Sequence, residues 1–191
     1  MTVIRQDDFI DSVADALQFI SYYHPLDFVK AVNEAYEREQ NPAARDAMAQ
    51  ILINSRMCAQ GHRPICQDTG IVTVFLKIGM DVQWDAEISV ADMVNEGVRR
   101  AYTHPDNVLR ASILEDPAGA RRNTKDNTPA VIHMEVIPGD TLDVQVAAKG
   151  GGSENKSKLA MLNPSDSIVD WVVKTIPTMG AGWCPPGILG I

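Results

Sequence analysis

The sequence predicts an α+β fold (mixed α/β), in which an N-terminal layer of helices packs on a small mixed or antiparallel sheet with flanking helices. Apolar residues recur at helical spacing over the first sixty residues, and apolar runs of strand length follow. Helices precede the strands and then mix with them, which is typical of this class. The 191 residues, 45% of them hydrophobic, suffice for one sizeable core, so we expect a single domain over residues 1–191.

Three helices are predicted before the first long strand. The first spans residues 7–22, where five apolar side chains share one face. The second begins at His24-Pro25, because proline suits the first turn of a helix. The third follows the break at Asn41-Pro42 and is expected to stop at Gly61.

The strands come next along the chain. Residues 71–78 form a continuous apolar run typical of a strand, and a short strand is expected within 81–87. Ser89 is expected to cap a helix that continues to Tyr102, because Asp92 follows at the spacing of a capping box.

The second half of the chain begins with a polar stretch, 116–129, which we interpret as an exposed or ligand-facing loop. Strands are predicted over 130–137 and 141–147. The short link Pro138-Gly139-Asp140 between them indicates a hairpin. A further helix is expected to open at Pro164-Ser165 and to end near Pro177.

Composition excludes some classes of partner. The formal net charge is −8, which argues against nucleic acid or an anionic membrane as the partner. No signal peptide is visible, and no apolar run approaches the ~20 residues of a membrane span. We expect a cytoplasmic protein whose three cysteines are free thiols or metal ligands. The apolar ending, 187–191, suggests a fragment whose C-terminal remainder is absent.

Two polar stretches carry the candidate chemistry. Cys66-Gln67-Asp68-Thr69-Gly70 places a soft metal ligand, an amide and a carboxylate directly before a strand. Lys149-Gly150-Gly151-Gly152-Ser153-Glu154-Asn155-Lys156 presents backbone N–H groups suited to an anion, strengthened if a helix begins at about Asn155. A merely flexible loop is the alternative. A nucleotide-binding P-loop ranks lower, because Asn155 replaces the required glycine.

The cysteines allow several interpretations. Cys58, His62 and Cys66 recur at spacings of four and would suit zinc on one helix, but Gly61 and Pro64 interrupt that helix. We therefore favour a buried, structural Cys58 and a surface His62. Cys184 precedes two prolines, as cysteines beside iron–sulfur clusters often do, although a buried structural thiol is the alternative.

Taken together, five stretches resemble the N-terminal catalytic domain of class I, iron–sulfur-dependent fumarate hydratases. They occur in the family's order from about residue 45 onward. They are Cys66-Gln67-Asp68-Thr69-Gly70, Asn107 to Ser112 with Arg110, Asn123-Thr124, Lys149 to Lys156 and Cys184-Pro185-Pro186.

The resemblance implies a hydro-lyase that interconverts fumarate and L-malate at a 4Fe-4S cluster with one open iron. Cys66 and Cys184 would be two cluster ligands, and the third would lie outside this chain. Gln67 and Asp68 would contact the substrate, with Asp68 in proton transfer. Arg110, Lys149 and Gly150 would bind substrate. A homodimer and a missing C-terminal domain or subunit are further implications.

Two other functions stay open at this point. Iron–sulfur tartrate dehydratases share the Cys66 and Cys184 stretches, but the glycine-rich stretch from Lys149 is more similar to that of fumarases. The other alternative is a non-catalytic or zinc-binding module that has kept the fold. The isolated chain is expected to be inactive, since part of the site would be missing.

Overall fold

The computed structural model describes residues 2–66, 69–150, 156–180 and 189–191. The chain divides into two compact units, residues 1–149 and 150–191. The predicted single domain over residues 1–191 stays a prediction.

The sheet of the first unit has three strands, β2 (Ile71–Gly79), β6 (Val131–Ile137) and β7 (Leu142–Lys149), in the order β6-β2-β7. Strand β2 pairs in parallel with β6 and antiparallel with β7. This mixed sheet, together with helices on one of its faces, confirms the predicted α+β class.

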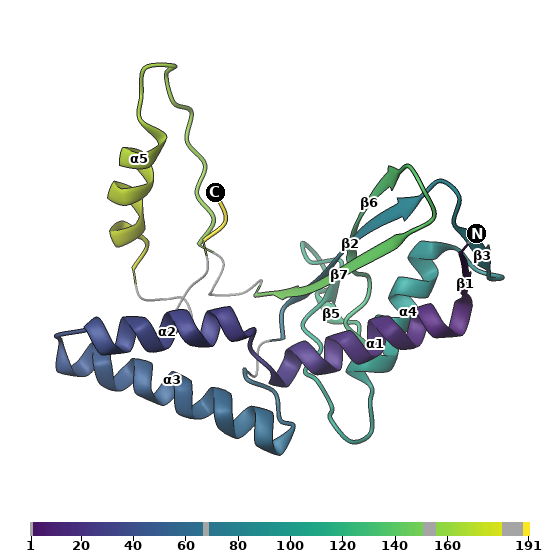
Figure 1. Cartoon of the computed structure of the whole chain (residues 1–191), viewed down its shortest axis with the longest axis horizontal. Coiled ribbons are helices and arrows are strands. Elements are labelled where there is room, and N and C mark those ends of the chain that lie inside the picture. Colours follow the sequence, from purple (N-terminus) through teal and green to yellow (C-terminus); the bar gives the residue numbers. More distant parts are fainter. Residues whose placement is uncertain (1, 67–68, 151–155, 181–188) are drawn as a thin grey trace. The chain divides into compact units, whose positions relative to one another are not determined.

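The predicted hairpin of the last two strands is wrong, because β2 lies between β6 and β7 (Figure 1). Their short link crosses the end of β2 instead. There the N–H of Gly79 donates to the Thr141 carbonyl at 2.8 Å, and the N–H of Asp81 donates to the Gly139 carbonyl at 2.9 Å. The apolar β2 is buried most fully when both of its edges are paired, and a turn signal does not reveal this competition.

Helices α1 (Gln6–Tyr22) and α4 (Val90–Tyr102) run side by side against the sheet (Figure 1). They approach closely at Gly97, where a Cβ would lie 2.8 Å from the Ile10 carbonyl oxygen. Each large apolar side chain buried here contributes roughly 1.5–3 kcal/mol. The core consists of Phe9, Ile10, Val13, Leu17, Val72, Val74, Leu76, Met93, Val94, Val98, Ala101, Tyr102 and Leu109.

Helices α2 (Leu26–Arg38) and α3 (Pro42–Gly61) pack on each other as a helical pair beyond α1 (Figure 1). The Asn41 side chain caps α3 by accepting the backbone N–H groups of Ala43 and Ala44. The helix ends at Gly61 as predicted, although the left-handed residue that follows is His62, with φ of 47°.

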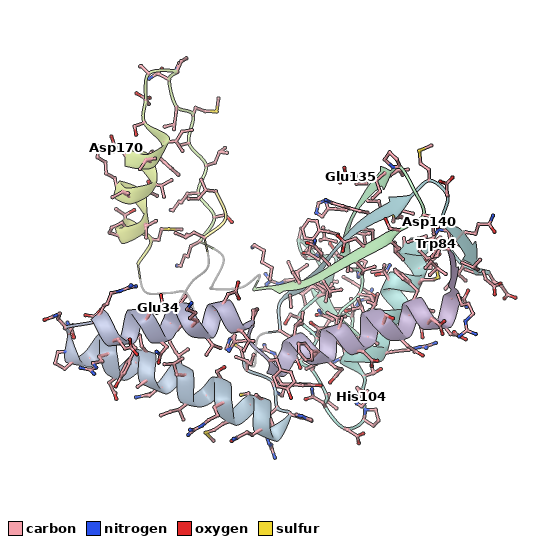
Figure 2. The ribbon with its side chains drawn as sticks, viewed as in Figure 1. Glu34, Trp84, His104, Glu135, Asp140 and Asp170 are labelled. Carbon is pink, nitrogen blue, oxygen red and sulfur yellow. The ribbon has the colours of Figure 1, made fainter. Side chains whose placement is uncertain are left out.

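The short strand expected within residues 81–87 is present as β3 (Gln83–Asp85), and it pairs in parallel with β1 (Val3–Arg5). Trp84 of β3 packs edge-on against Phe9, with ring centroids 5.4 Å apart. Trp84 and Asp140 lie at this end of the unit (Figure 2). The Ser89 cap of α4 is confirmed, because its hydroxyl oxygen accepts the Asp92 N–H at 3.1 Å.

The polar stretch predicted as a loop is mostly irregular and exposed. It includes part of a two-stranded antiparallel element, β4 (Leu114–Glu115) with β5 (Arg122–Asn123). Arg121, Lys125 and Asn127 have positive φ angles in this region. Such backbone angles are uncommon outside glycine and are often found where a loop serves a site.

The second unit contains α5 (Ile168–Thr175), followed by a 3₁₀ turn, Ile176–Met179. The helix begins after Ser167, whose hydroxyl oxygen accepts the Asp170 N–H, and so slightly later than predicted. Residues 156–163 form neither helix nor strand, so the helix considered at about Asn155 is not found there. Among all described residues, no helix is both long enough and apolar enough to cross a membrane.

We predict that Gly79→Ala destabilises the protein by about 1–3 kcal/mol, as overpacking does. A Cβ at this position would lie 2.3 Å from the Gly139 carbonyl oxygen, which is a main-chain atom that already accepts the N–H of Asp81. Urea unfolding of the variant and the wild type measures the difference. Gly61→Ala is the control, because its Cβ would meet only the Arg63 side chain at ordinary distance. Equal stability of the Gly79 variant and the wild type would show that the crossing link moves freely.

Candidate functional site

The segment that leads to Cys66 is fixed against two helices. The N–H of Ile65 donates to the Ser21 carbonyl at the end of α1, at 2.8 Å. The Asn54 side-chain amide on α3 donates to the Ile65 carbonyl at 3.2 Å. These two bonds hold the residue before Cys66 from both sides, so the thiol enters the site from an anchored backbone.

A pocket of about 190 Å³ lies beside Cys66. Its wall is mainly apolar, and the polar or titratable side chains in it come from four different segments. The lining residues are Leu17, Ile20, Ser21, His24, Ile65, Cys66, Thr69, Tyr102, Leu109 and Ala148. A partly buried thiol on such a wall suits a thiolate-bound metal centre screened from water.

The last residues of the Cys66–Gly70 loop are tied to three other segments. The Thr69 hydroxyl donates to the Arg110 carbonyl, and the Tyr102 hydroxyl donates to the Thr69 carbonyl at 3.3 Å. The Gly70 carbonyl accepts a hydrogen bond from the Asn127 side-chain amide at 3.0 Å. The loop is therefore fixed where it enters β2.

The register of the sheet brings Lys149 to the same place. Ile71, the first residue of β2, lies opposite Lys149, the last residue of β7. Ala148, next to it, lines the pocket with Cys66. The exposed Lys149 and the following Gly150 therefore lie at the sheet end where the Cys66 loop arrives, although far from it in sequence.

Arg110 is the third predicted residue at this end of the sheet. Its backbone carbonyl is bound by Thr69, and its side chain is exposed. In the part of the chain that the structure describes, the Arg110 guanidinium forms no salt bridge. An ordinary surface ion pair therefore does not account for Arg110 among those residues.

Cys58 is a structural residue, as we expected. It is buried, and its thiol lies 3.6 Å from Asn54 Oδ1 and 3.7 Å from the Pro64 carbonyl. Burial raises the pKa of the Cys58 thiol, which disfavours the metal-binding thiolate. His62 is exposed and stacks on Tyr22, also as expected.

Within the described residues no three histidine, cysteine or acidic side chains are grouped to hold a metal. The zinc interpretation of Cys58, His62 and Cys66 is therefore not supported. Gln67, Asp68 and Cys184 lie outside the described residues, as do Gly151–Asn155. The roles predicted for Gln67, Asp68 and Cys184 stay predictions.

Our sequence reasoning missed three side chains at the site, namely His24, Tyr102 and Asn127. His24 was considered only as the start of a helix, and Tyr102 only as the end of one. His24 Nδ1 lies 3.0 Å from the Ser55 hydroxyl, its ring stacks on Phe28, and burial lowers the pKa of its imidazole. A lone histidine or tyrosine gives no local signal, because the pocket forms only when distant segments meet.

A partly buried thiol at an apolar pocket, with an arginine and a lysine at the same end of a sheet, suits an enzyme that acts on an anion. The family comparison agrees with that class. Residues 10–191 match the sequence model of the family described as fumarate hydratase (Fumerase). The chain belongs to this family, and the match begins well before the residues that carried the resemblance.

Relatives of two activities are found. A Methanocaldococcus jannaschii protein provisionally named L(+)-tartrate dehydratase subunit alpha is 32% identical over 95% of this chain and 65% of its own length. The anaerobic class I fumarate hydratase of Escherichia coli K12 is 33% identical over 72% of this chain and 25% of its own. An L(+)-tartrate dehydratase subunit alpha of Escherichia coli UTI89 is 25% identical over 94% and 59%. The chain thus spans between a quarter and about two thirds of these proteins.

The lowered pKa of His24 predicts a pH-dependent stability. A histidine in the unfolded chain titrates near pH 6.5, whereas the pKa of folded His24 is lower. Below about pH 6.5 the unfolded chain therefore binds more protons than the folded protein, which favours unfolding. Stability should therefore fall as pH drops from about 7.5 to 5.5, and His24→Gln should weaken this fall. Urea unfolding at both pH values measures it. Ser55→Ala keeps the imidazole and should retain the dependence, whereas an unchanged dependence in His24→Gln would contradict the prediction.

Proposed function

We propose that this chain is the cluster-binding part of a hydro-lyase that adds water to fumarate to give L-malate. One observation carries the proposal. The pairing of Ile71 with Lys149, together with the hydrogen bond from the Thr69 hydroxyl to the Arg110 carbonyl, brings two cationic residues to the loop that holds Cys66. Membership of the fumarate hydratase family supports the same reaction.

Cys66 is proposed as one thiolate ligand of a 4Fe-4S cluster, and Cys184 as a second. The partly buried Cys66 thiol lies on an apolar pocket wall, and it fits this group because iron–sulfur clusters are held by cysteine thiolates. When bound, such a cluster with an open iron supplies a Lewis acid that eases departure of hydroxide. The third ligand is proposed to come from outside this chain.

The remaining residues are proposed to bind the dicarboxylate and to move its proton. The planar Arg110 guanidinium suits a bidentate contact with one carboxylate. Lys149 and the backbone N–H of Gly150 would stabilise the negative charge that develops when the C–H proton beside a carboxylate is removed. Gln67 would contact the substrate, and Asp68 would transfer a proton at the hydroxyl group of the substrate.

A partner is part of the proposal, because the chain spans only part of its relatives' length. Two relatives are named as alpha subunits, which supports a second subunit or a C-terminal domain. We propose that it supplies the other base and more cations. The chain alone would then be inactive. A homodimer and a cytoplasmic location stay predictions.

Dehydration of L(+)-tartrate is the second candidate function. The relatives that bear this name match 94–95% of the chain, whereas the Escherichia coli K12 fumarate hydratase matches 72%. Assay of the full-length protein, joined by its partner where it has one, with both substrates decides between them. A kcat/KM for fumarate below that for tartrate would overturn the first proposal in favour of the second.

The cysteines are predicted to differ in cluster binding. After anaerobic reconstitution, the full-length wild type should hold about four iron atoms per chain, and Cys66→Ser should hold almost none. Cys58→Ser should load like the wild type, because Cys58 is buried away against Asn54 and the Pro64 carbonyl. Iron analysis of the purified proteins measures the difference. One bound zinc with no iron uptake would contradict the proposal and support a zinc-binding module.

Arg110→Lys is predicted to raise KM for the dicarboxylate about tenfold or more, because lysine cannot form the bidentate contact. Cluster content should stay the same, since the side chain is exposed and not a ligand. Steady-state kinetics of the loaded enzyme measure KM and kcat separately. Arg121→Lys, at another exposed arginine, is the matched control. An unchanged KM would remove Arg110 from the proposed site.

A further inference from the structure

Asn127 is a polar residue in the interior of the first unit, and its side chain is 0% exposed. It follows the irregular loop after β5 and precedes β6, and its φ is 61°. Asparagine tolerates this left-handed conformation better than most residues. A fully buried amide is costly unless its oxygen and nitrogen both find partners, so its contacts explain its presence.

Both ends of this amide bind main chain. Asn127 Oδ1 accepts the N–H of Ser112 at 2.7 Å and the N–H of Ile113 at 3.2 Å. Its Nδ2 donates to the Gly70 carbonyl at 3.0 Å. One side chain therefore bridges the end of the Cys66 loop and the segment directly after Arg110.

The Arg110 segment needs such bridges, because residues 108–113 belong to no helix or strand. Its conformation is fixed by side chains from elsewhere. Besides Asn127, the Asn123 amide donates to the Ala111 carbonyl at 2.8 Å, and Thr69 donates to the Arg110 carbonyl. Thr69 and Asn127 form two neighbouring bridges between the Cys66 loop and this segment.

A buried amide contributes little net stability, but it fixes the relative orientation of the backbone segments that it binds. Its desolvation offsets most of what its hydrogen bonds contribute, whereas its geometry allows one arrangement of the bonded backbones. The residues so arranged are the proposed cluster ligand and the proposed carboxylate-binding arginine. Their separation sets whether a substrate reaches both, and small misplacements in such sites are expensive.

We propose that Asn127 is a positioning residue, which sets Arg110 relative to the Cys66 loop without touching the substrate. This role rests on the proposed function, since it acts through Arg110. Asn127→Asp keeps the left-handed conformation and the acceptor for Ser112 and Ile113, but places a carboxylate oxygen against the Gly70 carbonyl. The repulsion should separate the two segments.

The test uses the full-length, cluster-loaded protein with its partner. Asn127→Asp should raise KM about tenfold and weaken binding of succinate, a non-reacting dicarboxylate, by a similar factor. Iron content should stay at the wild-type level. Asn95→Asp is the matched control, because Asn95 Oδ1 accepts the N–H of Ala130 at 2.9 Å away from the loop. It should leave KM and succinate binding unchanged.

A double-mutant cycle with Arg110→Lys separates positioning from folding. If Asn127 acts through Arg110, Asn127→Asp should cause less than about a twofold further loss of succinate affinity in the Arg110→Lys background. An equal loss in both backgrounds would overturn the positioning role. A lower stability and a lower iron content of Asn127→Asp, with unchanged succinate affinity, would also overturn it.

Thr69→Val provides a second route if Asn127→Asp does not fold. It removes the hydroxyl that donates to the Arg110 carbonyl and keeps the side-chain shape. The same coupling to Arg110→Lys is expected, and wild-type succinate affinity would overturn the proposal. A wild type that loads no iron, or acts on neither substrate, contradicts the proposed function and the positioning role with it. An active wild type with an additive cycle contradicts the positioning role alone.

Discussion

The central position of β2 in its sheet determines where the site residues meet. Its inward side chains, Val72, Val74 and Leu76, are almost completely buried under α1 and α4. A slip of the strand by one residue would turn all three toward the outer face, so their burial fixes the register. The same register sets Ile71 opposite Lys149. Apolar burial on one face of the sheet thus places the cation and the thiol loop at its end.

Two kinds of contact, apolar burial and amide hydrogen bonds, hold different parts of the fold. The apolar core supplies most of the stability, and it anchors the Arg110 segment through Leu109, but apolar contacts are non-directional. There the structure uses amides. Gln18 and Asn107 bind each other at 2.6 Å, and Gln18 also donates to the Ala101 carbonyl at the end of α4. Asn127 is a further amide of this kind, which binds the main chain of Ser112, Ile113 and Gly70.

The sequence predicted well what is determined locally. Helical periodicity and the caps at Asn41 and Ser89 involve residues a few positions apart, so helix limits were found nearly correctly. Strand order depends instead on which segments pair with the two edges of β2. The hairpin prediction was wrong because β6 and β7 each pair with β2 and not with each other. The stretches with Cys66 and Lys149 were selected for their local chemistry, but only the family resemblance placed them in one site, because no spacing rule joins them. Asn127 was overlooked, since its role exists only once three segments meet.

The described side chains account for the proposed carboxylate binding better than for the choice of substrate. Fumarate, L-malate and tartrate are all four-carbon dicarboxylates, so Arg110 and Lys149 would serve each of them equally. Tartrate differs by its additional hydroxyl group, and a hydroxyl is recognised only by a donor or acceptor placed to meet it. In the proposed site that group is Gln67, Asp68 or a residue of the partner. In the proposed site, specificity between the two hydro-lyase reactions would therefore depend on the loop after Cys66 and on the partner, whereas the sheet end would supply what the two reactions share.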